Sequence, residues 1–595
     1  MTALTTSIER DYIQRLESRR AQLAAGDRRH AWFGYLRIGI AASAVAVFWA
    51  LGLNRLAWLL APLGVFVVVA LLHARLLNHL DRVRSAIHFY ERGLARIRHQ
   101  WMGQGRAGET YRQPDHLYAD DLDIFGRGSL FELLATTRTR AGEEVLAHWL
   151  LTPSSHATAR ARQEAVRELA GRLDLRETIA VVGDHVKVAV DAPLLRRWAA
   201  LPGGVGTPAI RAGVSTLVVV TIGTLGWWSQ TDQAGTAAAL LLIAQVLVGA
   251  ALRPRVVAVI EAVDEPSHDL DVLARLLRSI EQETFRSAHL QQLQQALRGS
   301  HTASAEIARL SRLVALLASR RNVMFAVPAG FLMWATQWAF AIDAWKRRVG
   351  VQIPHWLDVV GEFEALLSLA GFTAEHPTFV FPELVDGPPQ IAATGLAHAT
   401  LPSDAVPNDL ALGADAEQLL VVSGSNMSGK STWMRTIGVA VVLARMGAPV
   451  RARTFRLTPL DIGAAIRVQD SLADGRSRFF AEILRLKHIV DLARQRQGAV
   501  LFLLDEILSG TNSHDRRIGA EAIMTSLVGT DAVGLVTTHD LALATIADRL
   551  GGRAVNAHFD DHFEGGTLRF DYTLKPGVVE TSNALALMRS IGIDV

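Results

Sequence analysis

The sequence predicts a mixed fold, in which a mainly α-helical core carries transmembrane hairpins and is followed by a C-terminal α/β domain. Three observations predict it. Uncharged stretches of 16 to 19 residues occur in two pairs, apolar residues recur at three- and four-residue steps around Leu273 to Phe285, and a strand, loop and helix pattern starts at Leu419. The length of 595 residues allows about three to five structural units.

The composition excludes several classes of protein. Half of the residues are hydrophobic and 20% are charged, so a disordered chain is excluded and a membrane-associated part is expected. The chain has no cysteine, which excludes disulfide scaffolds, thiolate metal sites and cysteine nucleophiles. The net charge of +3 is too small to indicate nucleic-acid binding by itself.

The paired uncharged stretches predict two helical hairpins. The first pair is Ile38 to Leu53 and Leu56 to Leu72, and the second is Ala212 to Trp228 and Ala234 to Leu252. Helices of this length can also be buried in a large soluble core, but tight polar turns and tryptophans at the ends favour a membrane. Arginines flank both pairs, and Arg55 is the only basic residue in either turn. The positive-inside rule therefore predicts a multi-pass protein of the cytoplasmic membrane, with the C-terminal domain and both termini in the cytoplasm.

A fifth uncharged stretch, Asn322 to Ile342, is long enough to span a bilayer. Arg320-Arg321 precede it and Lys346-Arg347-Arg348 follow it, so a single crossing would place one basic cluster outside. We therefore expect a buried helix or one at the membrane interface. The N-terminus shows no cleavable signal, because a charged helical segment precedes the first apolar block.

These patterns predict five regions in order along the chain. They are an N-terminal helix, a transmembrane hairpin at about 38–72 and an Arg-rich helix (1–116), a helical core (117–200), a second transmembrane hairpin at about 212–252 (201–256), a helical lever (257–370) and an α/β domain (371–595).

A phosphate-binding loop is predicted at the start of the C-terminal domain. Gly424, Gly429, Lys430 and Ser431 satisfy G-x-x-x-x-G-K-[ST] between an apolar strand-like run and a helical pattern, which is the context that the motif requires. The glycines let backbone N–H groups close around phosphate oxygens at a helix N-terminus. We expect Lys430 to reach the β- and γ-phosphates and the Ser431 hydroxyl to bind Mg²⁺.

Two further strands are predicted to end beside this loop. Val500 to Leu504 is a continuous apolar run, typical of a central parallel strand, and Asp505 and Glu506 close it. Asp505 suits Mg²⁺ coordination, and Glu506 is placed to orient or deprotonate an attacking water. Ala532 to Val536 is the third strand, and His539 follows it. That histidine is either an ordinary residue at the edge of the core or, as we favour, a contact of the γ-phosphate.

These residues together resemble the MutS family, the ATPases of DNA mismatch repair. The resemblance implies that the α/β domain is a P-loop ATPase domain of the ABC type that uses ATP and Mg²⁺. It covers Gly395 to Ile593 strongly, and a weaker match in the helical core runs from Gly128 to Gln163. The matching segments are the phosphate loop Asn426 to Thr432, the signature-like loop Asp470 to Ser477 with Phe479 and Glu482, the loop Gly510 to Asp515, and Lys575-Pro576-Gly577 with Glu580.

The resemblance implies a composite site between two subunits and a homodimer formed through the ATPase domains. One subunit would contribute Asp505, Glu506, His539 and the loop Gly424, Ser425, Asn426, Met427, Ser428, Gly429, Lys430, Ser431 and Thr432. Its partner would contribute Ser477 and Asp515 across the nucleotide.

Two departures from the family bear on function. Ser425 stands where a MutS phosphate loop usually has proline, which should alter loop stiffness more than chemistry. The first 120 residues hold a hairpin and an Arg-rich helix instead of a mismatch-recognition domain, so we expect a membrane-anchored variant without that domain. Phe89-Tyr90-Glu91 spells the family's recognition tripeptide, but it lies in a helical run and is interpreted as coincidence.

Three functional hypotheses follow. The first is a membrane-anchored, MutS-like ATPase that also binds double-stranded DNA, with mismatch specificity doubtful. The second is a mechanochemical ATPase that acts on membrane or protein partners without nucleic acid. The third is an exporter, and it is weakest because the hairpins carry no intramembrane charge beyond Arg37 at an edge. The arginines of the helix after the first hairpin do not separate the first two hypotheses, because lipid headgroups and DNA phosphates both attract them.

Overall fold

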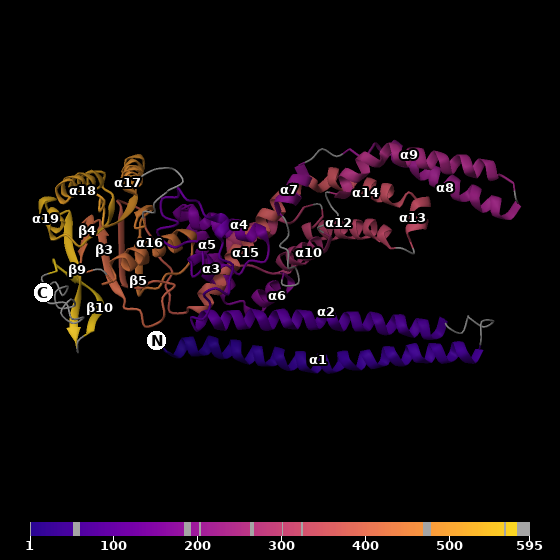
Figure 1. The fold of residues 1–595 in the computed structure, drawn as a ribbon, viewed down its shortest axis with the longest axis horizontal. Coiled ribbons are helices and arrows are strands. Elements are labelled where there is room, and N and C mark those ends of the chain that lie inside the picture. Colours follow the sequence, from indigo (N-terminus) through magenta and orange to yellow (C-terminus); the bar gives the residue numbers. More distant parts are fainter. Residues whose placement is uncertain are drawn as a thin grey trace.

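The computed structural model describes residues 2–51, 60–183, 192–200, 204–231, 233–261, 267–299, 301–322, 325–425, 427–467, 478–564 and 567–579. The molecule is elongated and mostly helical, with mixed sheets confined to one end (Figure 1). Two helical arms extend from a central helical core and end at the opposite side of the molecule from the sheets. The two arms therefore point in the same direction.

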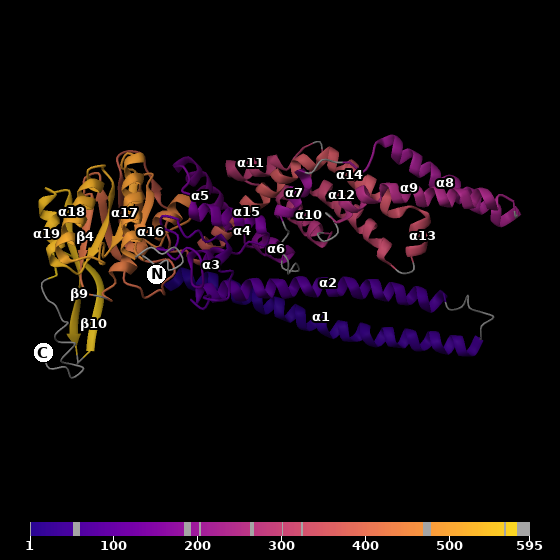
Figure 2. The same cartoon turned by 45° about the horizontal axis from the view of Figure 1, so that its top comes forward.

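The first arm is a hairpin of two long helices, α1 (Thr2–Leu51) and α2 (Leu60–Ile97), which pack along their length. The N-terminal helix and the first uncharged stretch form one continuous helix, because nothing in Thr2–Leu51 breaks the helical pattern. The base of the hairpin packs against α6 (Leu173–Gly183) and α15 (Ile353–Glu375). Beyond that base, the hairpin extends away from the rest of the chain (Figure 2).

The tripeptide Phe89-Tyr90-Glu91, interpreted above as a coincidental match, lies within α2, and two of its residues have packing roles. Tyr90 is fully buried, and its hydroxyl donates a 2.5 Å hydrogen bond to Glu177 of α6. Phe89 lies against Tyr12 of α1, with ring centroids 6.3 Å apart. These contacts hold the hairpin to the core.

The second arm contains a hairpin of α8 (Pro208–Thr231) and α9 (Gly235–Glu261). The polar segment Ser229 to Gln233, which separates the two uncharged stretches and was expected to be a turn, is helical at its start, because α8 continues through Thr231. The Ser229 and Thr231 hydroxyls donate hydrogen bonds of 2.7 and 2.9 Å to the carbonyls of Gly226 and Trp227. Each polar side chain thus finds a partner within the helix and does not need to leave it.

The fifth uncharged stretch is not one helix, which corrects the expectation of a single buried or interfacial helix. It forms α13 (Ala326–Phe331) and the first half of α14 (Trp334–Val349). The chain breaks at Met333, whose φ of 47° is left-handed and incompatible with a continuing right-handed helix. α14 packs against α9 and against α12 (Ala303–Ala318).

The central core is built around α15, which is buried on most of its surface. Short helices surround it, and Ser129, Thr139, Ser155 and Ser287 each accept a hydrogen bond at a helix N-terminus. The elements that pack against α15 include α3 (Leu130–Leu134), α4 (Arg140–Leu151), α5 (His156–Ala170), α7 (Ala192–Ala200), α11 (Ala288–Ala296) and η4 (Gly350–Gln352). The helical part also contains η2 (Glu109–Tyr111), α10 (Ser267–Gln282), which packs against α12 and α6, and η3 (Ser319–Arg321), which packs against α12 and α13.

The α/β unit at the other end contains two sheets. The small sheet has the order β1-β5-β2-β3, with β1 (Glu383–Leu384), β2 (Gln390–Leu396), β3 (Asn408–Gly413) and β5 (Thr454–Leu457). The large sheet has the order β10-β9-β4-β8-β7-β6, and all its pairs are parallel except β9 with β10. Its strands are β4 (Leu419–Ser423), β6 (Asp461–Ala465), β7 (Val500–Asp505), β8 (Val533–Thr538), β9 (Ala554–Glu564) and β10 (Thr567–Pro576).

Helices cover both faces of the large sheet, so its central strands are buried on both sides. α16 (Lys430–Met446) lies on one face with the helical core, while α17 (Arg478–Gln495), α18 (Ser513–Val528) and α19 (Leu541–Arg549) lie on the other. Alternate residues of β7 serve the two cores, with Leu501 and Leu503 toward α16 and Phe502 toward α17. The core beneath α16 is continuous with that of the helical core.

Candidate functional site

The loop between β4 and α16 has a backbone that only glycine adopts easily at two positions. Gly424 and Gly429 have φ values of +150° and +104°. A Cβ at Gly424 would lie 2.9 Å from the Phe559 carbonyl oxygen and from Ser428 Oγ. The glycines of the sequence motif are thus required by backbone conformation and by close packing of the loop on β9.

Lys430 closes this loop on itself. Its Nζ donates hydrogen bonds of 2.9 Å and 2.8 Å to the carbonyls of Gly424 and Ser425, and the side chain is only 5% exposed. Burial lowers the pKa of Lys430, and the nearby carboxylates of Glu506 and Asp505 oppose that shift. The loop therefore holds the Lys430 ammonium group against two of its own backbone carbonyls.

Several hydroxyls of the loop are available to a ligand. Ser425 Oγ and Ser428 Oγ are buried, and neither has a hydrogen-bond partner among the described residues. Met427 between them has a left-handed φ of 73° and is 83% exposed. Asn426 lies outside the described residues. Because buried hydroxyls are normally paired, these two groups fit a site that accepts an oxygen-rich ligand such as phosphate.

The predicted metal ligands lie side by side. Ser431, in the first turn of α16, donates a 2.5 Å hydrogen bond from Oγ to Asp505 Oδ2 at the end of β7. The other carboxylate oxygen, Oδ1, accepts a hydrogen bond from the Thr537 hydroxyl of β8. In the part of the chain that the structure describes, no group of three or more His, Asp or Glu side chains could hold a metal ion. A hydroxyl and one carboxylate fit Mg²⁺, which usually takes its other ligands from water and phosphate.

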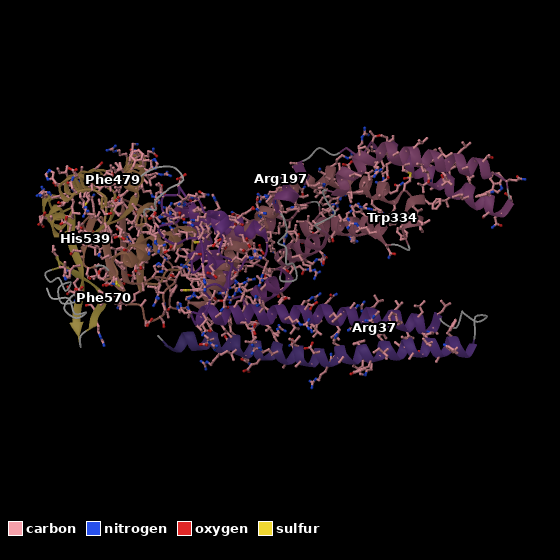
Figure 3. All side chains as sticks on the ribbon, viewed as in Figure 1. Arg37, Arg197, Trp334, Phe479, His539 and Phe570 are labelled. Atoms are coloured by element: carbon pink, nitrogen blue, oxygen red, sulfur yellow. The ribbon has the colours of Figure 1, made fainter. Side chains whose placement is uncertain are left out.

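Glu506 and His539 lie at neighbouring strand ends. β7 and β8 are adjacent, and the Glu506 N–H donates a 3.2 Å hydrogen bond to the Thr537 carbonyl. Glu506 has a left-handed φ of 45°, and its Oε1 is 3.9 Å from Lys430 Nζ and 3.3 Å from His539 Nδ1. His539 is half exposed at the sheet end of the molecule (Figure 3). A strained carboxylate between two basic groups is typical of a functional position.

A cavity of about 750 Å³ is lined by part of this site and by an apolar wall, whereas His539, Ser425 and Ser428 are not among its described lining. Lys430, Ser431, Thr432, Asp505 and Glu506 line one part. The wall opposite comes from the segment after β2 and from β9 and β10, namely Leu396, His398, Leu401, Pro402, Val406, Phe559 and Tyr572. The sequence prediction missed this wall, because its residues come from segments far apart in the chain. The short run of apolar and turn residues from Leu401 to Asn408 was the only local signal.

His398 is a neutral member of that wall. Burial, followed by the charges of Arg435 and Arg451, lowers the pKa of His398 to about 4. Its Nδ1 lies 2.8 Å from the Thr400 hydroxyl. An uncharged ring in an apolar wall suits contact with a flat heterocycle better than contact with phosphate.

Asp515, one of the two residues expected from a partner subunit, is not among the described residues that line this cavity. Ser477 lies outside the described residues. Asp515 is exposed in the first turn of α18, where its backbone N–H donates a 2.9 Å hydrogen bond to the Asn512 cap. Its side chain is therefore available at the surface and absent from the described lining of the cavity.

A buried carboxylate that the sequence prediction missed connects the helical core to the edge of this sheet. Asp121 Oδ1 accepts 2.7 Å hydrogen bonds from the backbone N–H groups of Ile466 and Arg467, just after β6. Its Oδ2 accepts a 2.6 Å hydrogen bond from Arg485 of α17. Arg435 of α16 donates to the Asp121 carbonyl. One residue of the core thus contacts three elements of the α/β unit.

The fold and the site define an α/β unit with a glycine-rich loop at the end of a parallel sheet. Residues 420–594 match the family model MutS domain V. This region therefore carries a MutS domain V, and it is similar to the corresponding region of mismatch repair proteins.

Three curated relatives illustrate the extent of the match. DNA mismatch repair protein MutS 2 of Haloarcula marismortui is 36% identical over 206 residues, which are 34% of this chain and 21% of the relative. DNA mismatch repair protein MutS of Methanosarcina barkeri is 31% identical over 39% of this chain and 26% of the relative. DNA mismatch repair protein MSH3 of Candida glabrata is 30% identical over 40% of this chain and 24% of the relative. The matched region thus spans about a quarter of the length of these relatives.

Proposed function

We propose that the chain is a membrane-anchored ATPase of MutS type that binds and hydrolyses ATP with Mg²⁺. The observation that carries this proposal is the convergence of Lys430, Ser431, Asp505 and Glu506 on one cavity, beside a loop with unpaired buried hydroxyls. The family resemblance supports the same reading.

The geometry suggests a role for each group. Lys430 and the loop N–H groups hold the triphosphate, and Ser431 with Asp505 would hold Mg²⁺. When bound, Mg²⁺ supplies neutralisation of phosphate charge. Glu506 orients the attacking water. His539 lies beside Glu506 and contacts the γ-phosphate. The apolar wall with His398 takes the base. Positioning and charge neutralisation supply most of the rate acceleration in such reactions.

Turnover by the Glu506→Gln variant tests this proposal. The amide keeps the shape of the side chain but cannot accept a proton, so we expect ATP binding to persist while turnover falls by about 100-fold or more. Lys430→Ala is expected instead to weaken ATP binding by about 100-fold, because a buried charged hydrogen-bond donor is lost. Glu521→Gln on α18 is the matched control, since Glu521 pairs with Arg549 away from the cavity. Equal turnover by wild type and Glu506→Gln would refute the role of Glu506.

The proposed dimer would complete the site. Asp515 and the loop that contains Ser477 would come from the partner subunit across the nucleotide. The exposed position of Asp515 is compatible with this arrangement. ATP-dependent dimerisation of Glu506→Gln, measured by light scattering, is the expected outcome, and the absence of any dimer would count against the composite site.

Membrane anchoring rests on four helices that are long and apolar enough to cross a bilayer by length and composition. They are Ser7–Trp49, Leu60–Ile97, Pro208–Thr231 and Gly235–Ile260, and between 6% and 17% of their most apolar windows is buried. Both hairpins point away from the α/β unit (Figures 1 and 2). This common direction suits insertion of both hairpins into one bilayer, with the α/β unit and both termini in the cytoplasm.

The output of the ATPase is proposed to be movement of the helical arms and not a grip on DNA. A specific observation favours this second hypothesis. Three arginines of the Arg-rich helix are paired within the chain: Arg96 with Glu375, Arg98 with Glu9, and Arg84 with Asp81. Paired arginines contribute less attraction for phosphate than the sequence alone suggests.

Duplex binding at two salt concentrations decides between the two outputs. Several phosphate contacts would make affinity fall by orders of magnitude between about 50 and 200 mM salt. We expect no specific binding of matched or mismatched duplex by the detergent-solubilised protein at the lower salt, with or without ATP. Salt-sensitive binding would instead restore the DNA-binding hypothesis.

A further inference from the structure

The short helix α13 presents an apolar surface that the chain does not cover. Val327 is 69% exposed and Phe331 is 44% exposed, whereas Ala329 on the opposite side is buried. No charged residue occurs from Asn322 to Ile342. α13 packs against α14 and against η3. A solvated surface helix would be expected to carry charges on its outer side, and this one carries none.

The position of α13 along the molecule matches the level at which the first hairpin becomes apolar. Figure 3 labels Arg37 and Trp334, which lie at a similar level along the long axis of the molecule. Arg37 is the last charged residue before the uncharged stretch of α1, and Trp334 follows α13 after a short break. The end of the second hairpin extends beyond this level, in the same direction as the first (Figure 1).

The break after α13 holds the helix in place. The Trp334 indole N–H donates to the Leu316 carbonyl at 2.7 Å, and its ring meets Phe325 edge to face at 5.0 Å. α14 is anchored in turn by Phe340 and Ile342, which are 1% and 0% exposed. The packing of Trp334 and α14 thus fixes α13 with its apolar side facing away from the protein.

The residues around α13 have the chemistry of a membrane boundary. Trp334 and Trp338 meet edge to face beside it with centroids 5.3 Å apart, and tryptophan is enriched at the level of lipid headgroups. Arg320 and Arg321 immediately precede it, whereas Arg347 and Arg348 of α14 are paired with Asp343 and Glu306. Basic residues on the cytoplasmic side attract anionic lipids. With 6 residues, α13 is far too short to span a bilayer.

We propose that α13 lies in the boundary between headgroups and acyl chains of the cytoplasmic leaflet, as a third membrane contact beside the two hairpins. The occupant of its apolar surface is lipid. This proposal rests on the membrane anchoring proposed above and adds a contact that the hairpins do not require. This contact also attaches the segment from α12 to α14 to the membrane surface. The segment leads directly into α15 of the core.

The absence of cysteine allows a site-specific test in the full chain. Three exposed valines are each replaced by cysteine and labelled with an environment-sensitive fluorophore: Val327 on α13, Val246 on α9 and Val351 on η4. Val246 and Val351 are 70% and 89% exposed, so they match Val327 in residue type and openness. The protein is reconstituted in phosphatidylcholine and phosphatidylglycerol vesicles that carry nitroxides at the headgroup or deep in the acyl chain. Aqueous iodide serves as a third quencher.

We expect loss of Val327→Cys fluorescence mainly with the shallow nitroxide, because interfacial helices are buried only about 5–10 Å deep. Val246→Cys should lose fluorescence with the deep nitroxide, and Val351→Cys with iodide alone. The inference about α13 is overturned if the deep nitroxide quenches the Val246→Cys label while the Val327→Cys label responds only to iodide. That outcome leaves the proposed membrane anchoring intact. A Val246→Cys label that responds to iodide instead overturns the anchoring as well. Two other outcomes also overturn the inference about α13. One is quenching of the Val327→Cys label by the deep nitroxide, and the other is protection of this label from every quencher by a protein partner or a second copy.

Discussion

α16 and α9 are both rich in apolar residues, yet the protein buries them very differently. Of the 17 residues of α16, 14 are buried between the large sheet and the helical core. In α9 only 17% of the most apolar window is buried, and Val246, Leu247 and Ile243 are more than half exposed. The apolar composition of a helix therefore shows that its side chains need to be buried, but it does not show whether protein or lipid buries them. A sheet and a core cover α16, and we propose that lipid covers α9.

The hydrogen bonding of polar groups also differs between the α/β unit and the helical arms. In the α/β unit several polar groups pair between different elements, as Asp505 of β7 does with Ser431 of α16 and as Arg485 of α17 does with Asp121 of the helical core. In the outer part of the arms, hydroxyls such as Thr224 and Ser229 bond only to carbonyls of their own helix. The first pattern fixes side chains of different elements relative to one another, whereas the second suits helices that we propose to lie in lipid, where polar groups must be satisfied within the helix.

The largest effect should come from breaking the joint between the core and the α/β unit. Asp121→Asn keeps the volume of the side chain but leaves Arg485 facing a neutral group inside the protein. Breaking a buried ion pair costs about 3–5 kcal/mol, so the thermal transition of the α/β unit should fall markedly. Differential scanning fluorimetry measures this, with Asp415→Asn in an exposed turn as the control. An unchanged transition in Asp121→Asn would mean that the joint does not stabilise the unit.

A matched pair of leucine substitutions tests the comparison itself. Leu443 of α16 is 1% exposed and Leu247 of α9 is 64% exposed. Leu443→Ala should cost about 3 kcal/mol, because a buried side chain leaves a cavity, whereas Leu247→Ala in detergent should cost less than about 0.5 kcal/mol. Thermal unfolding of both variants in the same detergent provides the measurement. Equal losses would show that α9 is packed against protein.

A smaller effect is expected on acidification, through His398 of the α/β unit. The pKa of His398 is lowered to about 4 in the folded chain, so between that value and about 6.5 the unfolded chain binds more protons. Stability from His398 is therefore complete above pH 6.5 and is lost as the pH falls toward 4, by about 2 kcal/mol between pH 7 and pH 5. His398→Asn should lose less stability over this range than wild type. A wild type and a variant with the same pH dependence would contradict the assignment.

The fold could be predicted from the sequence wherever one segment carries its own pattern. The continuous apolar run of β7 indicated a strand buried on both faces, and the order of the large sheet places β4, β8 and β7 next to one another. The four apolar helices were predicted from length and absence of charge. The break at Met333 was not predicted, because nothing local demands a left-handed residue there and the packing of Trp334 favours it.

The candidate site divides in the same way. The glycines, Lys430, Ser431 and the two carboxylates follow from motifs with a mechanism, and their roles stay predictions until turnover is measured. The apolar wall, the neutral His398 and the joint at Asp121 could not be predicted, since each depends on contacts between residues tens to hundreds of positions apart.

The sequence by itself determined which segments would be helix, strand or phosphate-type loop, because backbone preferences and apolar periodicity act over a few residues. Only the tertiary structure decided which apolar helices the protein buries, which carboxylates pair with Arg84, Arg96 and Arg98, and which residues line the cavity. Burial and pairing are properties of neighbours in space, and the chain brings those neighbours together only when it folds.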